Sequence, residues 1–437
     1  MAIKSVLHND KGYNFGWWRS TTTTEPPLTH APATQHHPGY LGKRTVCHRL
    51  LIRLANILVP LLVATTAIAE HVDLSLNEQV VMLPIRANGS VLQIQTTIFK
   101  PPGPGPFPLL LMNHGKTLGI PSLHKRQRYL AMSREFVRRG YAVVVPMRKG
   151  FAKSEGIYSD LGCNMADNGQ LQAEDIESAL SALINEVWVD KQRIIVAGES
   201  YGGLAALAFA TRRFPGVVGV INFSGGLRVE DHLCDWKESL INAVASYGAQ
   251  TDIPSLWFYG ENDRLFDQPL ANQLHETYQI AGGSSRLITF GKFKNNAHDM
   301  IFSHTGLPYW LSDVERFLAE LGLPFSPMIT LPEPRKKAAT QFAALDDVEA
   351  VPHLSGSGRA GYREYLSKSS PRAFAISSNG AWGWAEDGDD PIERALATCQ
   401  KYSRSACELY SIDNDIVWGD GNGDYRPKIA MWNHKPN

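Results

Sequence analysis

The most constraining feature of this chain is one serine placed between glycines at the junction of two contrasting segments. Ser200 lies in Gly198-Glu199-Ser200-Tyr201-Gly202, after the β-branched run RIIVAG and before the Ala-rich run LAALAFA. A tight turn from a strand into a helix lifts a serine hydroxyl clear of the backbone, and it crowds the positions two residues away, where glycine fits. The pattern therefore predicts a nucleophilic serine. The alternative is a glycine-rich turn in which Ser200 only caps the helix.

A nucleophilic serine needs a base, and the base needs an acid that orients it. The stretch NNAHDMIF supplies His298 in a predicted loop before a long helix, with His304 as a nearby competitor. The stretch PSLWFYGENDRLF supplies Asp263 just after a predicted strand, and we expect Glu261 to point elsewhere on the tight turn. The alternative is that both carboxylates cap the next helix.

Acyl chemistry at a serine also needs two N–H groups that stabilise the developing oxyanion. One is expected from Tyr201, because it follows the nucleophile at the start of a helix, where the helix dipole also helps. The second is expected from the loop NHGKTLG, with the backbone N–H of Lys116 as the first candidate and that of Thr117 as the second.

The order of the predicted elements indicates the fold class. From residue 79 to about residue 322, short apolar runs rich in β-branched residues alternate with helical patterns. This alternation predicts an α/β fold with a mostly parallel, doubly wound sheet of about eight strands, and Asn88-Gly89 predicts an antiparallel hairpin at its start. The chain is thus divided into a domain at 70–322, a Pro-rich linker at 323–350 and a small C-terminal α+β domain at 351–437.

Several stretches together resemble the α/β-hydrolases of the dienelactone hydrolase and prolyl-oligopeptidase-like branch. They are GPFPLLLMNHG, VVVPMRKGFAKSEG, AGESYGG, FYGENDRLF and NNAHD, with Ser200, Asp263 and His298 in that chain order. The resemblance implies hydrolysis of a small-molecule carboxylic ester through an acyl-enzyme, without a metal or another cofactor. Dienelactone hydrolases proper use a cysteine nucleophile. This chain has Ser200 instead, which favours a serine esterase.

Two other functions stay open. The first is a peptidase of the prolyl-oligopeptidase type, which is disfavoured because no propeller-length N-terminal domain is seen. The second is a binding protein on a hydrolase fold that no longer turns over. Nucleic acid is not expected as a partner, because the 43 Lys and Arg residues balance the 43 Asp and Glu residues.

Two cations follow a predicted strand at the end where ligands of such sheets bind. Arg148 and Lys149 are therefore candidate substrate contacts for an anionic group. The alternative is a loop anchored by salt bridges.

The N-terminal region has the layout of an export signal. Residues 1–42 are polar and are expected to be disordered or to be an extension upstream of the true start. Residues 43–69 combine a basic flank, an apolar run and Ala67-Ile68-Ala69, which is typical of a signal peptide cleaved after Ala69. The alternative is a short membrane anchor, although the apolar run is short for a span. We therefore expect a periplasmic or secreted protein without a stable membrane span.

The cysteines agree with export. Cys47 lies within the predicted signal, and the remaining even number favours two disulfides in an oxidising compartment. The expected pairs are Cys163 with Cys234 and Cys399 with Cys407, with four free thiols as the alternative.

Overall fold

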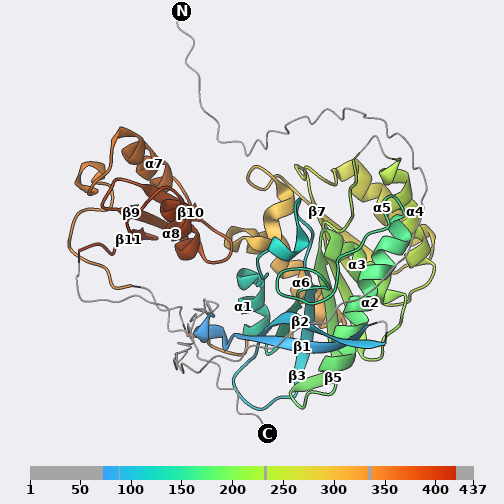
Figure 1. Cartoon of the computed structure of the whole chain (residues 1–437). Coiled ribbons are helices and arrows are strands. Elements are labelled where there is room, and N and C mark those ends of the chain that lie inside the picture. Colours follow the sequence, from blue (N-terminus) through green and yellow to red (C-terminus); the bar gives the residue numbers. More distant parts are fainter. Residues whose placement is uncertain (1–71, 88, 231–233, 333–336, 420–437) are drawn as a thin grey trace, which may run out of the picture. The chain divides into compact units, whose positions relative to one another are not determined.

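The computed structural model describes residues 72–87, 89–230, 234–332 and 337–419 (Figure 1). The predicted N-terminal extension and signal peptide lie outside these ranges. Within them, no helix combines the length and apolar character needed to cross a membrane.

The main sheet has eight strands in the order β1-β2-β4-β3-β5-β6-β7-β8 (Figure 1). The strands β1 and β2 form an antiparallel hairpin, β2 is antiparallel to β4, and the remaining neighbours are parallel. This confirms the predicted fold class and the opening hairpin. The strands are β1 Gln79–Ala87, β2 Ser90–Phe99, β3 Phe107–Asn113, β4 Ala142–Pro146, β5 Val189–Glu199, β6 Val217–Phe223, β7 Ser255–Gly260 and β8 Ser285–Phe290.

Helices cover both faces of this sheet. They are α1 Leu130–Arg138, α2 Met165–Leu183, α3 Tyr201–Ala210, α4 Trp236–Gly248, α5 Gln268–Ile280 and α6 Leu307–Glu320. One hydrophobic cluster joins the sheet to α2, α3, α4 and α5, and a second joins it to α1 and α6. In β3, Leu109 and Leu111 belong to the first cluster, whereas Leu110 and Met112 belong to the second.

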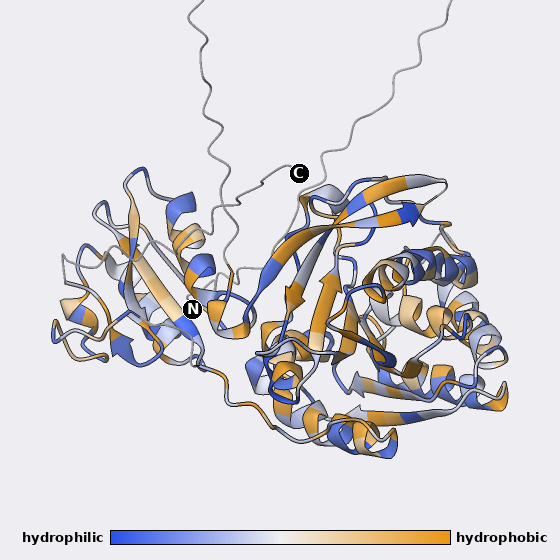
Figure 2. Cartoon of the chain, turned by 90° about the horizontal axis from the view of Figure 1, so that it is seen from below, coloured by the Kyte–Doolittle hydropathy of each residue, from blue (hydrophilic) through white to orange (hydrophobic). Residues whose placement is uncertain are grey.

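This division explains why the strands read as continuous apolar runs. Successive side chains of a strand point to opposite faces, so a strand that is covered on both faces is apolar at every position. Figure 2 accordingly shows the central strands mostly in the orange of hydrophobic residues, whereas the helices carry both colours.

The C-terminal unit, from α7 to β12, has its own sheet in the order β10-β9-β11-β12. Its elements are α7 Gly356–Leu366, β9 Arg372–Ser377, β10 Trp382–Glu386, α8 Pro391–Lys401, β11 Cys407–Ile412 and β12 Asp415–Ile416. The glycines of α7 lower its helix propensity, so the sequence alone does not indicate this helix. Packing explains the helix: Tyr362 and Tyr365 are fully buried, and a Cβ on Gly361 would lie 2.3 Å from the ring of Trp382.

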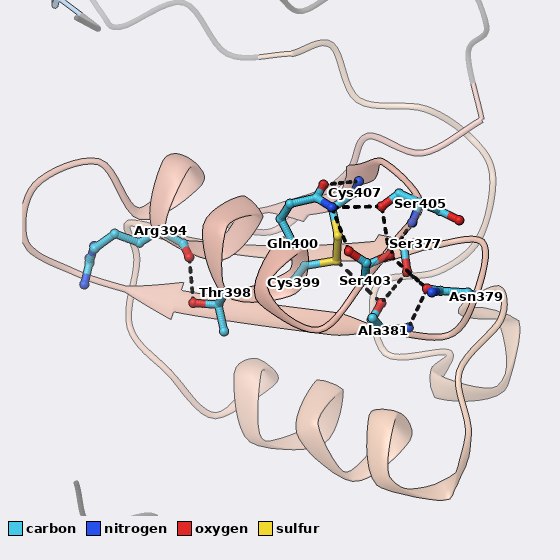
Figure 3. The surroundings of a disulfide bond; sticks show 10 residues. All are labelled: Ser377, Asn379, Ala381, Arg394, Thr398, Cys399, Gln400, Ser403, Ser405 and Cys407. Atoms are coloured by element: carbon cyan, nitrogen blue, oxygen red, sulfur yellow. Dashed lines mark hydrogen bonds between the residues drawn. A yellow bond between two sulfur atoms is a disulfide. The ribbon is translucent and has the colours of Figure 1, made fainter. Parts of the chain in front are cut away.

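Both expected disulfides, Cys163–Cys234 and Cys399–Cys407, are present. The second joins the end of α8 to the start of β11, as Figure 3 shows. Beside it, the Gln400 side chain accepts a hydrogen bond from the backbone N–H of Cys407 at 3.2 Å and donates to the carbonyls of Ser403 and Ser405. The bond therefore closes a turn that is already held by hydrogen bonds.

Removing the two disulfides should have unequal effects. A cross-link stabilises mainly by restricting the unfolded chain, so its effect grows with the length of the loop that it closes. The separations are 71 residues for Cys163–Cys234 and 8 for Cys399–Cys407. We expect a loss of about 4 kcal/mol for Cys163→Ser/Cys234→Ser and about 2 to 3 kcal/mol for Cys399→Ser/Cys407→Ser. Chemical denaturation of the wild type and of each double variant measures these losses in the free energy of unfolding. A wild type whose free energy of unfolding is the same with and without reductant would contradict the expectation.

Candidate active site

Ser200 is held in a strained turn between β5, which ends at Glu199, and α3, which begins at Tyr201. Its φ of 54° and ψ of −123° are unusual for a residue with a side chain. Such a conformation costs about 1 to 3 kcal/mol and persists only where the surroundings enforce it. Here the backbone N–H of Ser200 donates to the Phe223 carbonyl at 3.0 Å, and its carbonyl accepts from the N–H of Gly226 at 3.0 Å.

The two glycines of the motif are required by space. A Cβ on Gly198 would lie 2.0 Å from the carbonyl oxygen of Gly202, and a Cβ on Gly202 would lie 2.1 Å from that of Asn113. No side chain fits at either distance, so the turn exists only because both positions are glycine. The close approach of Gly202 also ties the turn to the end of β3, beside the predicted oxyanion loop.

The structure brings the predicted base and acid together. His298 lies in the short helix η3 (Ala297–Phe302), and its Nδ1 is 2.9 Å from Oδ2 of Asp263. The other oxygen of Asp263 accepts the backbone N–H groups of Leu265 and Phe266 at 2.8 and 3.0 Å. Burial raises the pKa of the Asp263 carboxyl, but these hydrogen bonds lower it more, so the pKa is below its usual value and the group is ionised.

Glu261 behaves as the sequence suggested, since its half-exposed carboxylate pairs with Lys292 at 3.4 Å, away from the imidazole. The side chain of His298 is buried, and the ring of Phe266 lies against it with centroids 5.7 Å apart. The imidazole is therefore shielded from water on the side of this ring.

Glu199 is the site residue that the sequence analysis missed. Its Oε1 lies 3.4 Å from Nε2 of His298, and its Oε2 accepts the backbone N–H of Gly115 at 2.9 Å and the hydroxyl of Tyr129 at 3.2 Å. Among the described residues, the hydrogen bonds of His298 do not include Ser200 Oγ. In this structure Nε2 therefore faces the residue next to the nucleophile. The available signal was a carboxylate directly before Ser200 in the motif.

The two carboxylates set the charge of the imidazole. Burial lowers the pKa of His298, but the hydrogen bonds and charges of Asp263 and Glu199 outweigh it and raise the pKa to about 10. At neutral pH the imidazole is therefore held as a cation. To act as a base towards Ser200, His298 has to be neutral and has to exchange the contact with Glu199 for one with the hydroxyl.

Both predicted oxyanion donors are available. Among the described residues, no hydrogen bond uses the backbone N–H of Lys116, and Tyr201 at the first position of α3 has no intrahelical acceptor. The N–H of Gly115, in contrast, is taken by Glu199. The Lys116 side chain is turned aside, where its Nζ donates to the Tyr158 hydroxyl at 2.8 Å.

Arg148 and Lys149 have protein partners instead of the substrate role suggested by their position. Arg148 is 1% exposed, and it donates to the His114 carbonyl at 2.5 Å and to Gln172 at 2.8 Å. Its guanidinium also lies over the Tyr201 ring, 5.6 Å from the centroid. Lys149 pairs with Asp175 at 3.0 Å. Arg148 thereby braces the oxyanion loop and the residue after the nucleophile.

A metal site is not found in the described part of the chain, where no group of three or more His, Cys, Asp or Glu residues is arranged to hold an ion.

The strand order, the strand–Ser200–helix turn and the contact of His298 with Asp263 together define the class of protein. The carboxyl ends of β5 and β7 carry Ser200 and Asp263, and the loop after β8 carries His298. These features are those of the α/β-hydrolase fold, and the site carries the groups found in serine hydrolases of that fold.

A more particular likeness comes from a family model. Residues 89–280 match the model of the X-Pro dipeptidyl-peptidase (S15) family. The matched stretch is less than half of the chain; it includes Ser200 and Asp263 and ends before His298. A comparison with curated protein sequences finds no significant match.

Solved structures of similar fold include esterases and peptidases. An esterase from Pyrococcus furiosus is 14% identical with a TM-score of 0.42, and the match covers 56% of this chain and 92% of that one. A puromycin-hydrolyzing peptidase from Mycobacterium tuberculosis is 17% identical with a TM-score of 0.42, covering 59% and 42%. An acylaminoacyl peptidase from Pyrococcus horikoshii is 15% identical with a TM-score of 0.43, covering 58% and 43%. Likeness at this level supports no argument about activity.

Replacing Glu199 by Gln should change the pH dependence of catalysis. The substitution keeps an acceptor for Gly115 but removes an anion that stabilises the imidazolium, so the pKa of His298 falls. The acid limb of kcat/KM, which reports the free enzyme, should lie well above pH 6.5 in the wild type and about 1 to 3 units lower in Glu199→Gln. Glu261→Gln is the matched control, because it removes an exposed carboxylate near Asp263. Identical limbs for wild type and Glu199→Gln would exclude this role of Glu199.

Proposed function

We propose that this protein hydrolyses carboxylic esters through an acyl-enzyme formed on Ser200. The observation that carries the proposal is the buried imidazole of His298, which joins Asp263 on one side to the residue next to Ser200 on the other. Asp263, His298 and Glu199 come from distant parts of the chain and meet there, and Ser200 directly follows Glu199. Exchange of the Glu199 contact for one with Ser200 Oγ would give the arrangement that serine hydrolysis requires.

In the proposed reaction, neutral His298 takes the proton of Ser200 Oγ at Nε2 while the oxygen attacks the acyl carbon. Asp263 keeps the proton of the imidazole on Nδ1 and stabilises the imidazolium that forms. The N–H groups of Tyr201 and Lys116 bind the oxyanion. Removing one such donor typically raises the activation free energy by about 3 to 4 kcal/mol. His298 then returns the proton to the leaving alcohol, and a water molecule, activated by the same base, releases the acid.

The second candidate is a peptidase that acts on X-Pro bonds, and the match of residues 89–280 to the S15 family favours it. The same groups would serve both reactions. An amine is a poorer leaving group than an alcohol, so peptide cleavage depends more strongly on proton delivery by His298. Ester cleavage makes the smaller chemical demand and is therefore proposed first. A panel of acyl p-nitrophenyl esters and aminoacyl-prolyl p-nitroanilides compares the two, and a higher kcat/KM on the prolyl amides would favour the peptidase.

An activity-based probe tests the nucleophile. We expect a fluorophosphonate to label the wild type and not Ser200→Ala, because only a serine activated by a base reacts. His298→Gln should slow labelling by about a thousandfold or more. Ser312→Ala, which alters an exposed serine of α6, is the matched control and should be labelled at the wild-type rate. Intact-protein mass spectrometry measures the label. An unlabelled wild type that is folded and binds esters would favour the non-catalytic alternative.

We also propose export, with the mature protein periplasmic or secreted. The disulfides Cys163–Cys234 and Cys399–Cys407 support this, since such bonds persist mainly in oxidising compartments. Cleavage after Ala69 would make Glu70 the first residue of the mature chain. Mass spectrometry of the N-terminal peptide from the native source reads this out directly, and peptides from residues 1–69 in the mature protein would refute the cleavage.

A further inference from the structure

A short acidic loop of the C-terminal unit contacts the segment that carries His298. The loop, residues 387–390, connects β10 to α8 and has the sequence Asp-Gly-Asp-Asp. The contacted segment, residues 294–305 (the histidine segment), runs from Lys294 through η3 to Thr305. The loop lies 82 or more residues further along the chain, so only tertiary structure brings the two together.

Asp387 binds both ends of the histidine segment with one carboxylate. At the first end, its Oδ2 accepts from Nζ of Lys294 at 2.5 Å. At the second end, it accepts from the hydroxyls of Ser303 and Thr305, and its Oδ1 accepts the backbone N–H of His304 at 2.7 Å. His298 lies between these two anchor points. The carboxylate therefore closes the segment that carries the imidazole.

Hydrogen bonds within the C-terminal unit fix the backbone around Asp387. The backbone N–H of Asp387 donates to the Pro371 carbonyl at 2.6 Å, and Arg394 of α8 donates to the backbone carbonyls of Glu386, Asp387 and Asp389. The side chain of Asp387 is only 5% exposed. Burial raises its pKa, but the bonds from Lys294, Ser303, Gly388 and His304 lower it to about 2, so the carboxylate is charged throughout the range in which an enzyme works.

A second residue of the same loop, Asp389, contacts the start of α1. Oδ1 of Asp389 accepts the backbone N–H of Leu130 at 2.8 Å, at the start of α1. The preceding residue, Tyr129, stacks on Phe302 of the histidine segment with centroids 5.0 Å apart, and its hydroxyl donates to Glu199. The loop thus contacts two elements that border the imidazole, and Tyr129 links them to the residue beside Ser200.

We propose that the acidic loop of the C-terminal unit positions the catalytic histidine, with Asp387 as the positioning residue that fixes residues 294–305 and so places His298 relative to Ser200. This rests on the proposed function, because it assigns the C-terminal unit a part in the same reaction. Errors of about 1 Å in the placement of a catalytic group can cost about a hundredfold in rate. The unit then contributes to turnover without touching the substrate.

The experiment compares full-length Asp387→Asn, Ser303→Ala and the double variant with the wild type. Asp387→Asn keeps the shape and removes the charge, and Ser303→Ala removes one bond at the far end of the contact. Asp415→Asn, an exposed carboxylate of β12 in the same unit, is the matched control. The readouts are kcat and KM on a p-nitrophenyl ester, the rate of fluorophosphonate labelling, thermal unfolding, and hydrogen exchange of a peptide spanning residues 294–305.

We expect Asp387→Asn to lower kcat and the labelling rate between about tenfold and a hundredfold with little change in KM, and to speed hydrogen exchange in residues 294–305. Ser303→Ala should have a smaller effect in the same direction. The loss of kcat in the double variant should be smaller than the product of the two single losses, because both changes disrupt the same contact. Asp415→Asn should match the wild type.

The inference and the proposed function fail in different ways. If the wild type is labelled and turns over esters, but Asp387→Asn and Ser303→Ala lose only thermal stability while kcat, labelling and exchange stay at wild-type values, the positioning role is overturned. If the folded wild type is not labelled, the proposed function falls with it, and hydrogen exchange alone decides whether Asp387 orders the histidine segment. If Asp387→Asn does not fold, the same comparison is made with Ser303→Ala.

Discussion

The arrangement of this site depends on one buried imidazole that is shared by two carboxylates. His298 contacts Asp263 through Nδ1 and Glu199 through Nε2, and these residues come from η3, from the loop after β7 and from the end of β5. In a buried setting, a charged group is stable only if its hydrogen-bonding partners are nearly complete. The two carboxylates meet this condition for the imidazolium, which is why the buried His298 has a raised pKa. The same contact explains why Glu199 has to yield Nε2 before Ser200 can be deprotonated.

The second layer of the site consists of buried groups that hold backbone in place. Arg148 fixes the oxyanion loop through the His114 carbonyl and lies over Tyr201, so one guanidinium orders the surroundings of both predicted N–H donors. Glu199 adds the N–H of Gly115 to the same arrangement. Burying an unpaired guanidinium or carboxylate has a high cost in free energy. Both Arg148 and Glu199 are hydrogen-bonded to backbone groups of the oxyanion loop. The site is therefore built as a network, in which the roles of neighbouring residues are coupled.

The sequence was most informative where local geometry leaves no choice. The turn around Ser200 could be read from two glycines, because any Cβ at Gly198 or Gly202 would overlap backbone atoms. The runs of β3 and β5 could be read as strands buried on both faces, since no polar alternation interrupts them. The helix α7 was missed for the opposite reason: its glycines lower helix propensity, and only the packing of Tyr362, Tyr365 and Trp382 makes it helical. Arg148 was predicted to contact an anionic substrate, because its charge and its place after a strand do not reveal that the side chain is buried.

By itself, the sequence determined the α/β architecture, the strained serine turn and the chain order of Ser200, Asp263 and His298, because each of these follows from spacing and from the steric needs of single residues. Only the tertiary structure decided which groups complete the site. Glu199 contacts His298, the buried Arg148 holds the oxyanion loop, and Asp387 contacts the histidine segment. These contacts join residues that are far apart in the chain, so they depend on how the sheet and the helices pack.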